Sequence, residues 1–339
     1  MVNLVINMKG MVISLKTLIG ITYNLYKNAV TLPGEAPKSN YDTIISIKDA
    51  LVSGGYDVEL FEVTENLPLK LTEHKPDIVF NNAEGISGPG KEAQVPAILD
   101  YYRIPYTGSD ETTILVAMDK ALAKSLVSAY NVRTPKYNII GQDMHSSGNT
   151  IPFPAIVKPI AEGSGRGISD VSVVYNSTDL NRILVKNLDL YKQKMLVEEY
   201  IQGREFTVGI IGNADDIRVF TPMEIVFNDK SNTLYSYEVK KNFKQYVKYV
   251  CPPDISEDVQ TEIKKTAKEI YRILGCRDYA RIDFRLSQDG LLYFLEVNPQ
   301  PGLTPGYSDL PMISGFCGVD YNTLILNIME TALVRYGMK

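Results

Sequence analysis

The chain has 339 residues, 45% of them hydrophobic, which is enough for two or three domains with hydrophobic cores. Its net charge of −5 argues against a general nucleic-acid-binding protein. The two histidines, His74 and His145, are far apart, which argues against a Ser-His-Asp hydrolase, and no Cys/His cluster has zinc spacing. Three separated cysteines, Cys251, Cys276 and Cys317, indicate a reducing, cytoplasmic compartment.

The first 23 residues contain no apolar run long enough to cross a bilayer and no signal-peptide cleavage pattern. We expect no membrane segment there. The pattern favours a short strand or a leader segment, followed by a strand at residues 17–22.

The first third of the chain alternates between strand and helix patterns, which predicts a parallel sheet covered by helices. No G-x-G-x-x-G follows the first strand, so a dinucleotide fingerprint is missing. The expected elements are helices at residues 41–53 and 92–102 and strands at residues 56–63, 77–81 and from residue 104.

Beyond residue 115 the predicted elements form a mixed α+β pattern. A polar loop at residues 228–248 separates the last two groups of strands. The expected helices lie at residues 117–129, from Ser177 or Thr178 to residue 186, from the Ser256 cap to residue 274, and at residues 321–336; the expected strands lie at residues 152–159, 169–174, 195–201, 205–211 and 223–227.

A hairpin near the C-terminus carries the most informative pattern. Asp289-Gly290 between alternating apolar residues is a strong hairpin signal. A two-residue turn there would pair Gln288 with Leu291, and would also pair Asp283 with Glu296 and Arg281 with Asn298. A four-residue turn would keep these side chains on one face, and only an odd loop would separate them. The other face would then be the core face, with Ile282, Phe284, Leu286, Tyr293, Leu295 and Val297.

Two carboxylates opposite each other on a hairpin repel by about 0.2–1 kcal/mol. A cation removes that penalty, and hard oxygen ligands suit Mg²⁺ held together with a phosphate. The sequence therefore predicts a metal site at Asp283 and Glu296, and the alternative is an exposed hairpin with scattered charges.

Further residues indicate a binding site for a nucleoside triphosphate. The glycine loop at residues 163–167 lies between two strands, unlike a Rossmann or Walker loop, but its N–H groups would suit a phosphate. Lys120, Lys158 and Lys240 border the same predicted cleft, and one of the carboxylates of Glu198, Glu199 and Glu205 would accept hydrogen bonds from ribose hydroxyls. A plain turn and an acidic edge strand are the alternatives.

Several short segments between about residue 77 and residue 321 resemble, in the same order along the chain, those of the ATP-grasp fold and, more narrowly, of the D-alanine–D-alanine ligase group. The matching segments are Ile104-Pro-Tyr-Thr-Gly-Ser109, Asp119-Lys120, Val157-Lys158-Pro159, Glu162-Gly163-Ser164, Leu196-Val-Glu-Glu-Tyr200, Gly203-Arg-Glu-Phe-Thr-Val208, Arg281-Ile-Asp-Phe284, Glu296-Val-Asn-Pro299 and Pro301-Gly302.

The resemblance implies an ATP-grasp fold of three subdomains: an N-terminal parallel α/β subdomain at residues 1–115, a central one with the glycine loop at 116–203, and a C-terminal one with the metal hairpin at 204–339. It implies an ATP-dependent carboxylate–amine ligase with an acyl-phosphate intermediate, using ATP and Mg²⁺, or Mn²⁺ in its place. Its partners would be amino acids or peptides, with no nucleic acid and no membrane, in a cytoplasmic homodimer.

The resemblance also implies a role for each matched residue. Metal ligands would be Asp283, Glu296 and Asn298; Lys120, Lys158 and Lys240 would hold phosphates together with Glu162 and Gly163; the backbone of Glu198, Glu199 and Tyr200 would bind adenine, and Glu205 the ribose; Arg281, Ser164, Gly302 and Lys241 would act on the reacting groups; Glu84 and Ser308 would contact substrate.

The departures from the family pattern fall on the amino-acid side. The family's His-Gly is replaced by Glu84-Gly85, its paired serines by Ser164-Gly165, and the tyrosine after the phosphate lysine by Lys241. Its N-terminal glutamate has only Glu35 as a weak counterpart. Arg166 and Lys241 would favour an anionic substrate.

Two other functions compete with a ligase. The replaced substrate-side residues are compatible with a non-catalytic ATP-binding regulatory protein of the same fold, although such a protein has no need of Arg281. A nicotinamide-dependent oxidoreductase would rest on the glycine loop, whose place between two strands argues against it.

Overall fold

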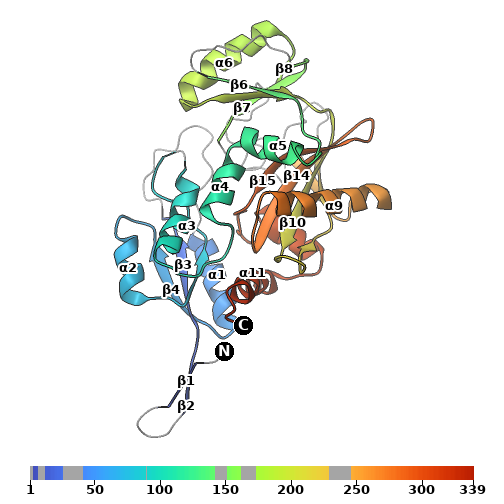
Figure 1. Ribbon diagram of the computed structural model, residues 1–339. Coiled ribbons are helices and arrows are strands. Elements are labelled where there is room, and N and C mark those ends of the chain that lie inside the picture. The colour runs from blue at the N-terminus through green and yellow to red at the C-terminus, as the bar shows by residue number, and fades with distance from the viewer. Residues whose placement is uncertain are drawn as a thin grey trace.

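The computed structural model describes residues 3–6, 12–25, 41–88, 90–141, 151–161, 173–228 and 246–339. Within these ranges the strands form a parallel N-terminal sheet, two antiparallel sheets and a separate two-stranded hairpin. In Figure 1 the separate hairpin extends from the end of the molecule where the chain starts. Its strands are β1 (Asn3–Ile6) and β2 (Val12–Leu15).

The N-terminal sheet is parallel, as the alternating pattern predicts, with strand order β4-β3-β5. Ile44, Ile47 and Leu51 repeat at helical spacing along α1 and are fully buried, which explains why the helix packs where it does. The strand expected from residue 104 is only a single bridge between Val79 and Tyr106. The elements are β3 (Leu18–Tyr23), α1 (Tyr41–Ser53), β4 (Asp57–Glu62), α2 (Leu67–His74), which the sequence analysis missed, β5 (Ile78–Asn81) and α3 (Lys91–Tyr101).

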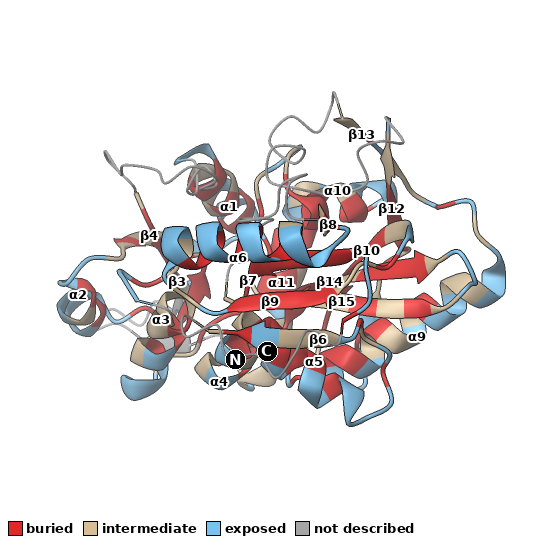
Figure 2. Cartoon of the chain, turned by 90° about the horizontal axis from the view of Figure 1, so that it is seen from above, coloured by how far each residue is buried: buried red, intermediate tan, exposed pale blue. Residues whose placement is uncertain are grey.

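The central sheet is antiparallel, with strand order β6-β9-β7-β8, and α6 covers one face. Figure 2 shows the outer side of α6 exposed and the strands beneath it buried. The strands are β6 (Tyr137–Ile140), also missed from the sequence, β7 (Ala155–Pro159), β8 (Val173–Val174) and β9 (Met195–Glu199).

Two helix predictions in this region are wrong. The helix expected at residues 117–129 is two helices, α4 (Glu111–Met118) and α5 (Lys120–Ser128), because Asp119 between them is extended and caps α5 with its side chain. Helix α6 (Ser177–Tyr191) is capped by Asn176 rather than by Ser177 or Thr178, and it ends only where Lys192 turns left-handed.

The C-terminal sheet is antiparallel, with the path β13-β12-β10-β14-β15 and β11 paired to β10. Ser256 caps α9 as predicted, and its hydroxyl accepts from Val259 N–H. The elements are β10 (Gly203–Ile211), β11 (Arg218–Val219), β12 (Met223–Phe227), β13 (Val247–Val250), α9 (Glu257–Ile273), β14 (Tyr279–Ser287), β15 (Leu292–Asn298), α10 (Asp309–Phe316) and α11 (Tyr321–Arg335).

Consecutive strands β9 and β10 belong to different sheets, so the chain passes between them at residues 200–202. Helix α5 lies between the central and C-terminal sheets (Figure 1). Its Ala123 and Val127 pack into the core of the C-terminal sheet, whereas Ala121 packs with Leu196 of β9. This helix therefore links the two sheets that carry most predicted site residues, and the subdomain bounds themselves remain predictions.

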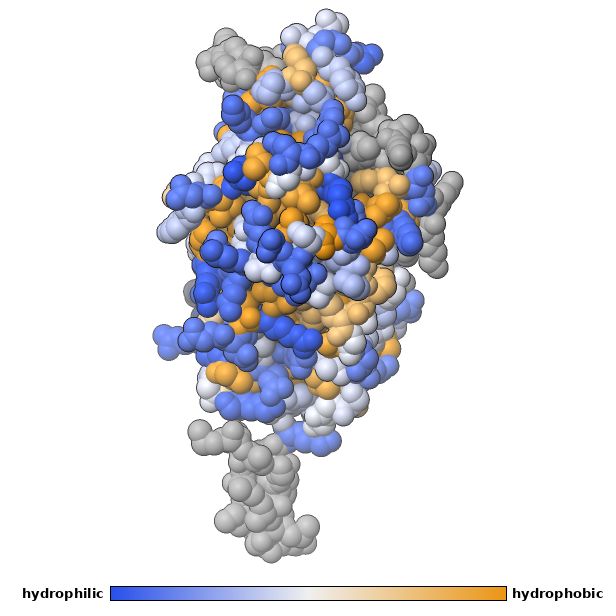
Figure 3. Space-filling model, turned by 90° about the vertical axis from the view of Figure 1, so that its right-hand side faces the viewer, coloured by the Kyte–Doolittle hydropathy of each residue, from blue (hydrophilic) through white to orange (hydrophobic). Residues whose placement is uncertain are grey.

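Hydrophobic residues on the face shown in Figure 3 are interleaved with hydrophilic ones. Scattered exposed hydrophobic side chains are usual on a folded protein and need no partner to explain them. Within the described part of the chain, no helix is long and apolar enough to cross a membrane.

Candidate active site

The hairpin of β14 and β15 closes with a loop of odd length. The N–H of Ser287 donates to the carbonyl of Leu291 at 2.9 Å, which leaves residues 288–290 as a three-residue loop. Gly290 has a φ of 81°, the left-handed conformation that such loops need at this position. The expected pairing of Gln288 with Leu291 is therefore wrong.

A β-bulge compensates for the odd loop. The pairing shifts by one residue between Asp283 and Phe284, and Leu295 is the extra residue on β15. Below the bulge, Asp283 lies opposite Glu296 and Arg281 lies opposite Asn298, as the sequence predicts.

The bulge also changes which residues of β15 face the core. Leu292 and Phe294 are buried in the hydrophobic cluster, whereas Tyr293 and Leu295, which were expected there, are only partly buried. Side chains on a strand alternate between its faces, and an inserted residue reverses that alternation on one side of the insertion. The other four predicted core residues are buried as expected: Ile282, Phe284, Leu286 and Val297.

Arg281 holds the Asp283 carboxylate through two hydrogen bonds. Nε and Nη2 donate to Oδ1 and Oδ2 at 3.1 and 2.9 Å, and the Thr207 hydroxyl donates to Oδ1 at 2.7 Å. The third nitrogen, Nη1, donates at 2.9 Å to Asp309, a residue that the sequence analysis did not single out. Burial acts to lower the pKa of Arg281, but Asp283 and Asp309 outweigh it and raise that pKa.

Lys120 reaches the other carboxylate of the hairpin. Its Nζ lies 3.6 Å from Glu296 Oε2, and its side chain is 6% exposed. Burial alone would raise the pKa of Glu296, but Lys120, Lys158 and Arg281 hold it below its usual value. Glu296 is therefore an anion surrounded by cations at neutral pH.

Lys158 and Glu198 form a buried ion pair across β7 and β9, 2.5 Å apart. A second lysine, Lys124 of α5, lies 3.3 Å from the other Glu198 oxygen and donates to the carbonyl of Phe294 at 3.3 Å. Burial would raise the pKa of Glu198, but the two lysines hold it below its usual value. Sequence reasoning missed Lys124, and its position one helical turn after Lys120 was the available signal.

The carboxylate expected to bind ribose is paired with an arginine. Arg285 Nη2 lies 2.6 Å from Glu205 Oε2, and Nη1 donates to the Tyr200 hydroxyl at 3.1 Å. Burial raises the pKa of Glu205, and Arg285 opposes that rise. Arg285 was not predicted, because a lone arginine in a strand usually faces solvent.

The segment expected to meet adenine lies at the C-terminal end of the inner strand β9. Glu199 N–H donates to the carbonyl of Lys136 at 2.9 Å, and Tyr200 N–H donates to that of Pro154 at 3.0 Å. These bonds fix the backbone position, and its contact with adenine stays a prediction.

On the substrate side, Ser308 lies against Gly302. The Ser308 hydroxyl accepts from Thr304 N–H at 3.1 Å, and a Cβ added to Gly302 would lie 2.8 Å from that oxygen. Only glycine fits there without displacing Ser308. Glu84 instead pairs with Lys91 at 2.6 Å, and its N–H donates to Asn24 at 2.8 Å.

Several predicted residues lie outside the described part of the chain, namely Glu35, Glu162, Gly163, Ser164, Gly165, Arg166, Lys240 and Lys241. Their predicted roles stay expectations.

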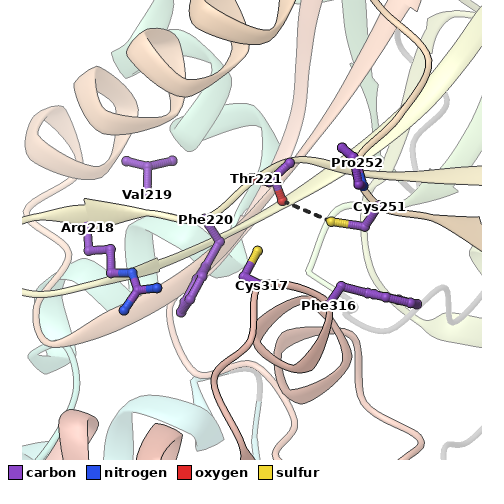
Figure 4. Close-up of a pocket in the computed structure, with 8 residues that line it drawn as sticks. All are labelled: Arg218, Val219, Phe220, Thr221, Cys251, Pro252, Phe316 and Cys317. Atoms are coloured by element: carbon purple, nitrogen blue, oxygen red, sulfur yellow. Dashed lines mark hydrogen bonds between the residues drawn. The ribbon is translucent and has the colours of Figure 1, made fainter.

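A pocket of about 280 Å³ lies elsewhere, against α10 and the turn after β13. Cys251 and Cys317 approach each other there from elements distant in the sequence, beside Arg218 and Phe220 (Figure 4). All three cysteines are free. The pocket contains no predicted site residue, so it does not compete with the hairpin as the nucleotide site.

Known proteins resemble this chain over most of its length. A family model described as "D-ala D-ala ligase C-terminus" matches residues 128–330. The D-alanine–D-alanine ligase of Sphingopyxis alaskensis is 32% identical over 293 residues, covering 85% of this chain and 91% of that protein. The ligase of Zymomonas mobilis is 31% identical over 317 residues, covering 91% of this chain and 95% of that protein.

Among solved structures, the D-alanine–D-alanine ligase from Bacillus anthracis complexed with ATP matches with a TM-score of 0.72. The match covers 95% of this chain and 100% of that one, at 22% sequence identity, which shows a shared ATP-grasp fold. From the family model and the relatives that it resembles along most of its length, the chain belongs to the D-alanine–D-alanine ligase family and is an ATP-dependent ligase of this type.

Proposed function

We propose that this ligase activates the carboxylate of one amino acid with ATP and joins it to the amine of a second. The observation that carries the proposal is the alternation of charges at the hairpin, where Lys120 pairs with Glu296 and Arg281 pairs with Asp283. Phosphoryl transfer needs this kind of site, because it depends on positioning and on neutralising charge.

The chain's own residues suit both steps of such a reaction. In the first step a substrate carboxylate attacks the γ-phosphorus of ATP and ADP leaves; Lys120 and Lys158 would hold the phosphates. In the second step an amine attacks the acyl carbon and phosphate leaves. Arg281 and the Gly302 N–H would stabilise the oxyanion of the tetrahedral intermediate, which forms when the amine attacks and breaks down when phosphate leaves.

Asp283, Glu296 and Asn298 would hold Mg²⁺ or Mn²⁺. The donor set fits such an ion: two carboxylates face each other, and Asn298 Oδ1 is oriented by the N–H of Gln300 at 3.1 Å. No three His, Cys, Asp or Glu side chains cluster in the described ranges, so phosphate oxygens would complete the shell, as is usual for Mg²⁺. When bound, the ion would neutralise charge on the β- and γ-phosphates.

The two amino acids are the open part of the proposal. D-alanine is the substrate named for the relatives. This chain has Glu84, paired with Lys91, where the family has a histidine, so another donor or acceptor is compatible with the site. Arg166 and Lys241 support an anionic substrate by their charge alone.

A coupled assay of ADP release, with amino acids offered singly and in pairs, tests the function. We expect release that depends on an amino acid and is greatest with one preferred pair. ATP binding without amino-acid-dependent release would support the non-catalytic alternative instead. If acidic amino acids are not preferred over neutral ones, the proposal of an anionic substrate fails.

The cytoplasmic location and a homodimer belong to the same proposal. Light scattering on the purified chain would test the dimer, for which a mass of one chain, 37.9 kDa, is the contrary result.

A further inference from the structure

Carboxylates hold the Arg281 guanidinium from two sides. Asp283 accepts from Nε and Nη2, and Asp309 accepts from Nη1 at 2.9 Å. The side chains of Arg281 and Asp309 are 6% and 1% exposed, so this second ion pair is shielded from water. A guanidinium has five N–H groups, and among the described residues three are bonded, which leaves one on each terminal nitrogen to meet a substrate.

A glycine in the sheet allows Asp309 to reach this position. Gly209 of β10 is the register partner of Arg281 on β14. A Cβ at Gly209 would lie 2.6 Å from Leu310 Cδ1, so the start of α10 packs closely onto the sheet only because this residue is glycine. Asp309 precedes Leu310 and is thereby placed over the neighbouring strand.

Asp283 has two demands on its carboxylate. It holds Arg281, and in the proposed reaction it also binds the metal ion. A carboxylate that shares its oxygens with a divalent cation interacts less strongly with a guanidinium, because the ion is the larger local charge. A buried guanidinium that loses its partner is costly and tends to move. Arg281 therefore needs a second anion that does not bind the metal.

We propose that Asp309 is a positioning residue for the reaction, and that it holds Arg281 toward the reacting carboxyl group while Asp283 binds the metal. This inference rests on the proposed function. In this role Asp309 acts through Arg281. Ser308 and Gly302 lie beside it in the same turn, so one short segment would orient both the guanidinium and the substrate end of the site.

Two variants separate the charge of Asp309 from its hydrogen bond. Asp309→Asn keeps an oxygen that accepts from Nη1 but removes the charge, whereas Asp309→Ala removes both. Asp278→Asn is the matched control, because Asp278 is equally buried and pairs with Arg335 at 2.7 Å while also accepting from Gly108 N–H. That cluster contains no predicted site residue.

The experiment measures kcat and KM at saturating Mg²⁺, together with Mn²⁺ binding by electron paramagnetic resonance without nucleotide or amino acid. For Asp309→Ala we expect kcat and kcat/KM to fall together by about 10- to 100-fold, with KM for ATP unchanged. Mn²⁺ should bind more weakly, because Arg281 then competes for Asp283 alone. For Asp309→Asn, we expect values of kcat and Mn²⁺ affinity between those of Asp309→Ala and of the wild type. Asp278→Asn should lower the melting temperature without changing kcat or Mn²⁺ affinity.

A folded Asp309→Ala variant with wild-type kcat and wild-type Mn²⁺ affinity would overturn the inference. An equal loss of kcat in Asp278→Asn would also overturn it, because the effect would then come from general destabilisation. If the wild type releases no ADP with any amino acid, the proposed function fails, and the Mn²⁺ measurement still tests the hold of Asp309 on Arg281.

Discussion

Lys124 of α5 and Glu198 of β9 form an ion pair, with their charged atoms 3.3 Å apart, in a place where the Lys124 side chain has no solvent exposure. Glu198 also pairs with Lys158, so the three residues connect α5 to both strands β7 and β9. Lys124 in turn donates to the backbone of β15. One lysine thus links the helix between the sheets to the strand that carries Glu296.

A double-mutant cycle should detect this link. Lys124→Met, Glu198→Gln and the double variant are compared by urea unfolding. We expect a coupling energy of about 1–3 kcal/mol, because residues in one buried charge network are not independent. Effects that add to within about 0.5 kcal/mol would show that the pair contributes little.

The same lysine predicts a pH dependence of stability. Burial lowers the pKa of Lys124 from 10.5 to about 8, although Glu198 opposes the shift. Between these two values the unfolded chain binds more protons than the folded one, so the free energy of unfolding should rise with pH. Between pH 8 and 10.5, we expect the free energy of unfolding of the wild type to rise by up to about 3 kcal/mol relative to that of Lys124→Met.

The measurement is urea unfolding of both proteins at intervals across that range. The variant cancels the contribution of titrating groups that do not interact with Lys124. Parallel curves for the two proteins would contradict the prediction, and so would a wild type that loses stability relative to the variant as pH rises.

The facing carboxylates of the hairpin should be essential for turnover. Asp283→Asn and Glu296→Gln each remove one charge that a metal ion needs, so we expect kcat to fall by about 100-fold or more. Asp289→Asn is the matched control, because Asp289 is an exposed residue in the loop of the same hairpin. Unchanged ADP release in the first two variants would refute the metal assignment.

Arg285 should influence the affinity for ATP through Glu205. Without the arginine, burial would raise the pKa of Glu205 further and make it a poorer acceptor for ribose hydroxyls. Arg285→Met should therefore raise KM for ATP about tenfold, which corresponds to about 1.4 kcal/mol of binding. The neighbouring Arg204 pairs with Glu224 instead, and Arg204→Met should leave KM unchanged. Equal effects of the two variants on KM would contradict a specific role of Arg285 at the ribose.

The hairpin shows how far sequence reasoning reaches. The pairing predicted for a two-residue turn, Asp283 opposite Glu296 and Arg281 opposite Asn298, is the one observed, although the turn itself is not. The period of a strand does not predict the odd loop or the bulge at Leu295, because loop length and bulges depend on how the two strands twist and pack. The two deviations offset each other at the carboxylates but not at Tyr293, which the prediction placed in the core.

Residues that act through tertiary contacts were the ones missed. Lys124, Arg285 and Asp309 each look like surface charges in the sequence. They are buried because a helix or strand distant in the chain supplies a partner. For Arg285 and Asp309 no local pattern reveals that partner, and for Lys124 the only local signal is its spacing from Lys120. The break between the two helices at Asp119 was missed because apolar residues continue at helical spacing across it. Only the extended backbone at Asp119 shows that one helix ends there and that its side chain caps the next.

Transfer of an oxygen label tests the account most directly. The amino acid whose carboxylate is activated, labelled with ¹⁸O at both carboxylate oxygens, is supplied with ATP and its unlabelled partner, and the released phosphate is analysed by mass spectrometry. Attack of the carboxylate on the γ-phosphorus, followed by attack of the amine on the acyl carbon, should leave one ¹⁸O atom in each phosphate. Phosphate without the label would contradict the account, because its new oxygen would then have come from water.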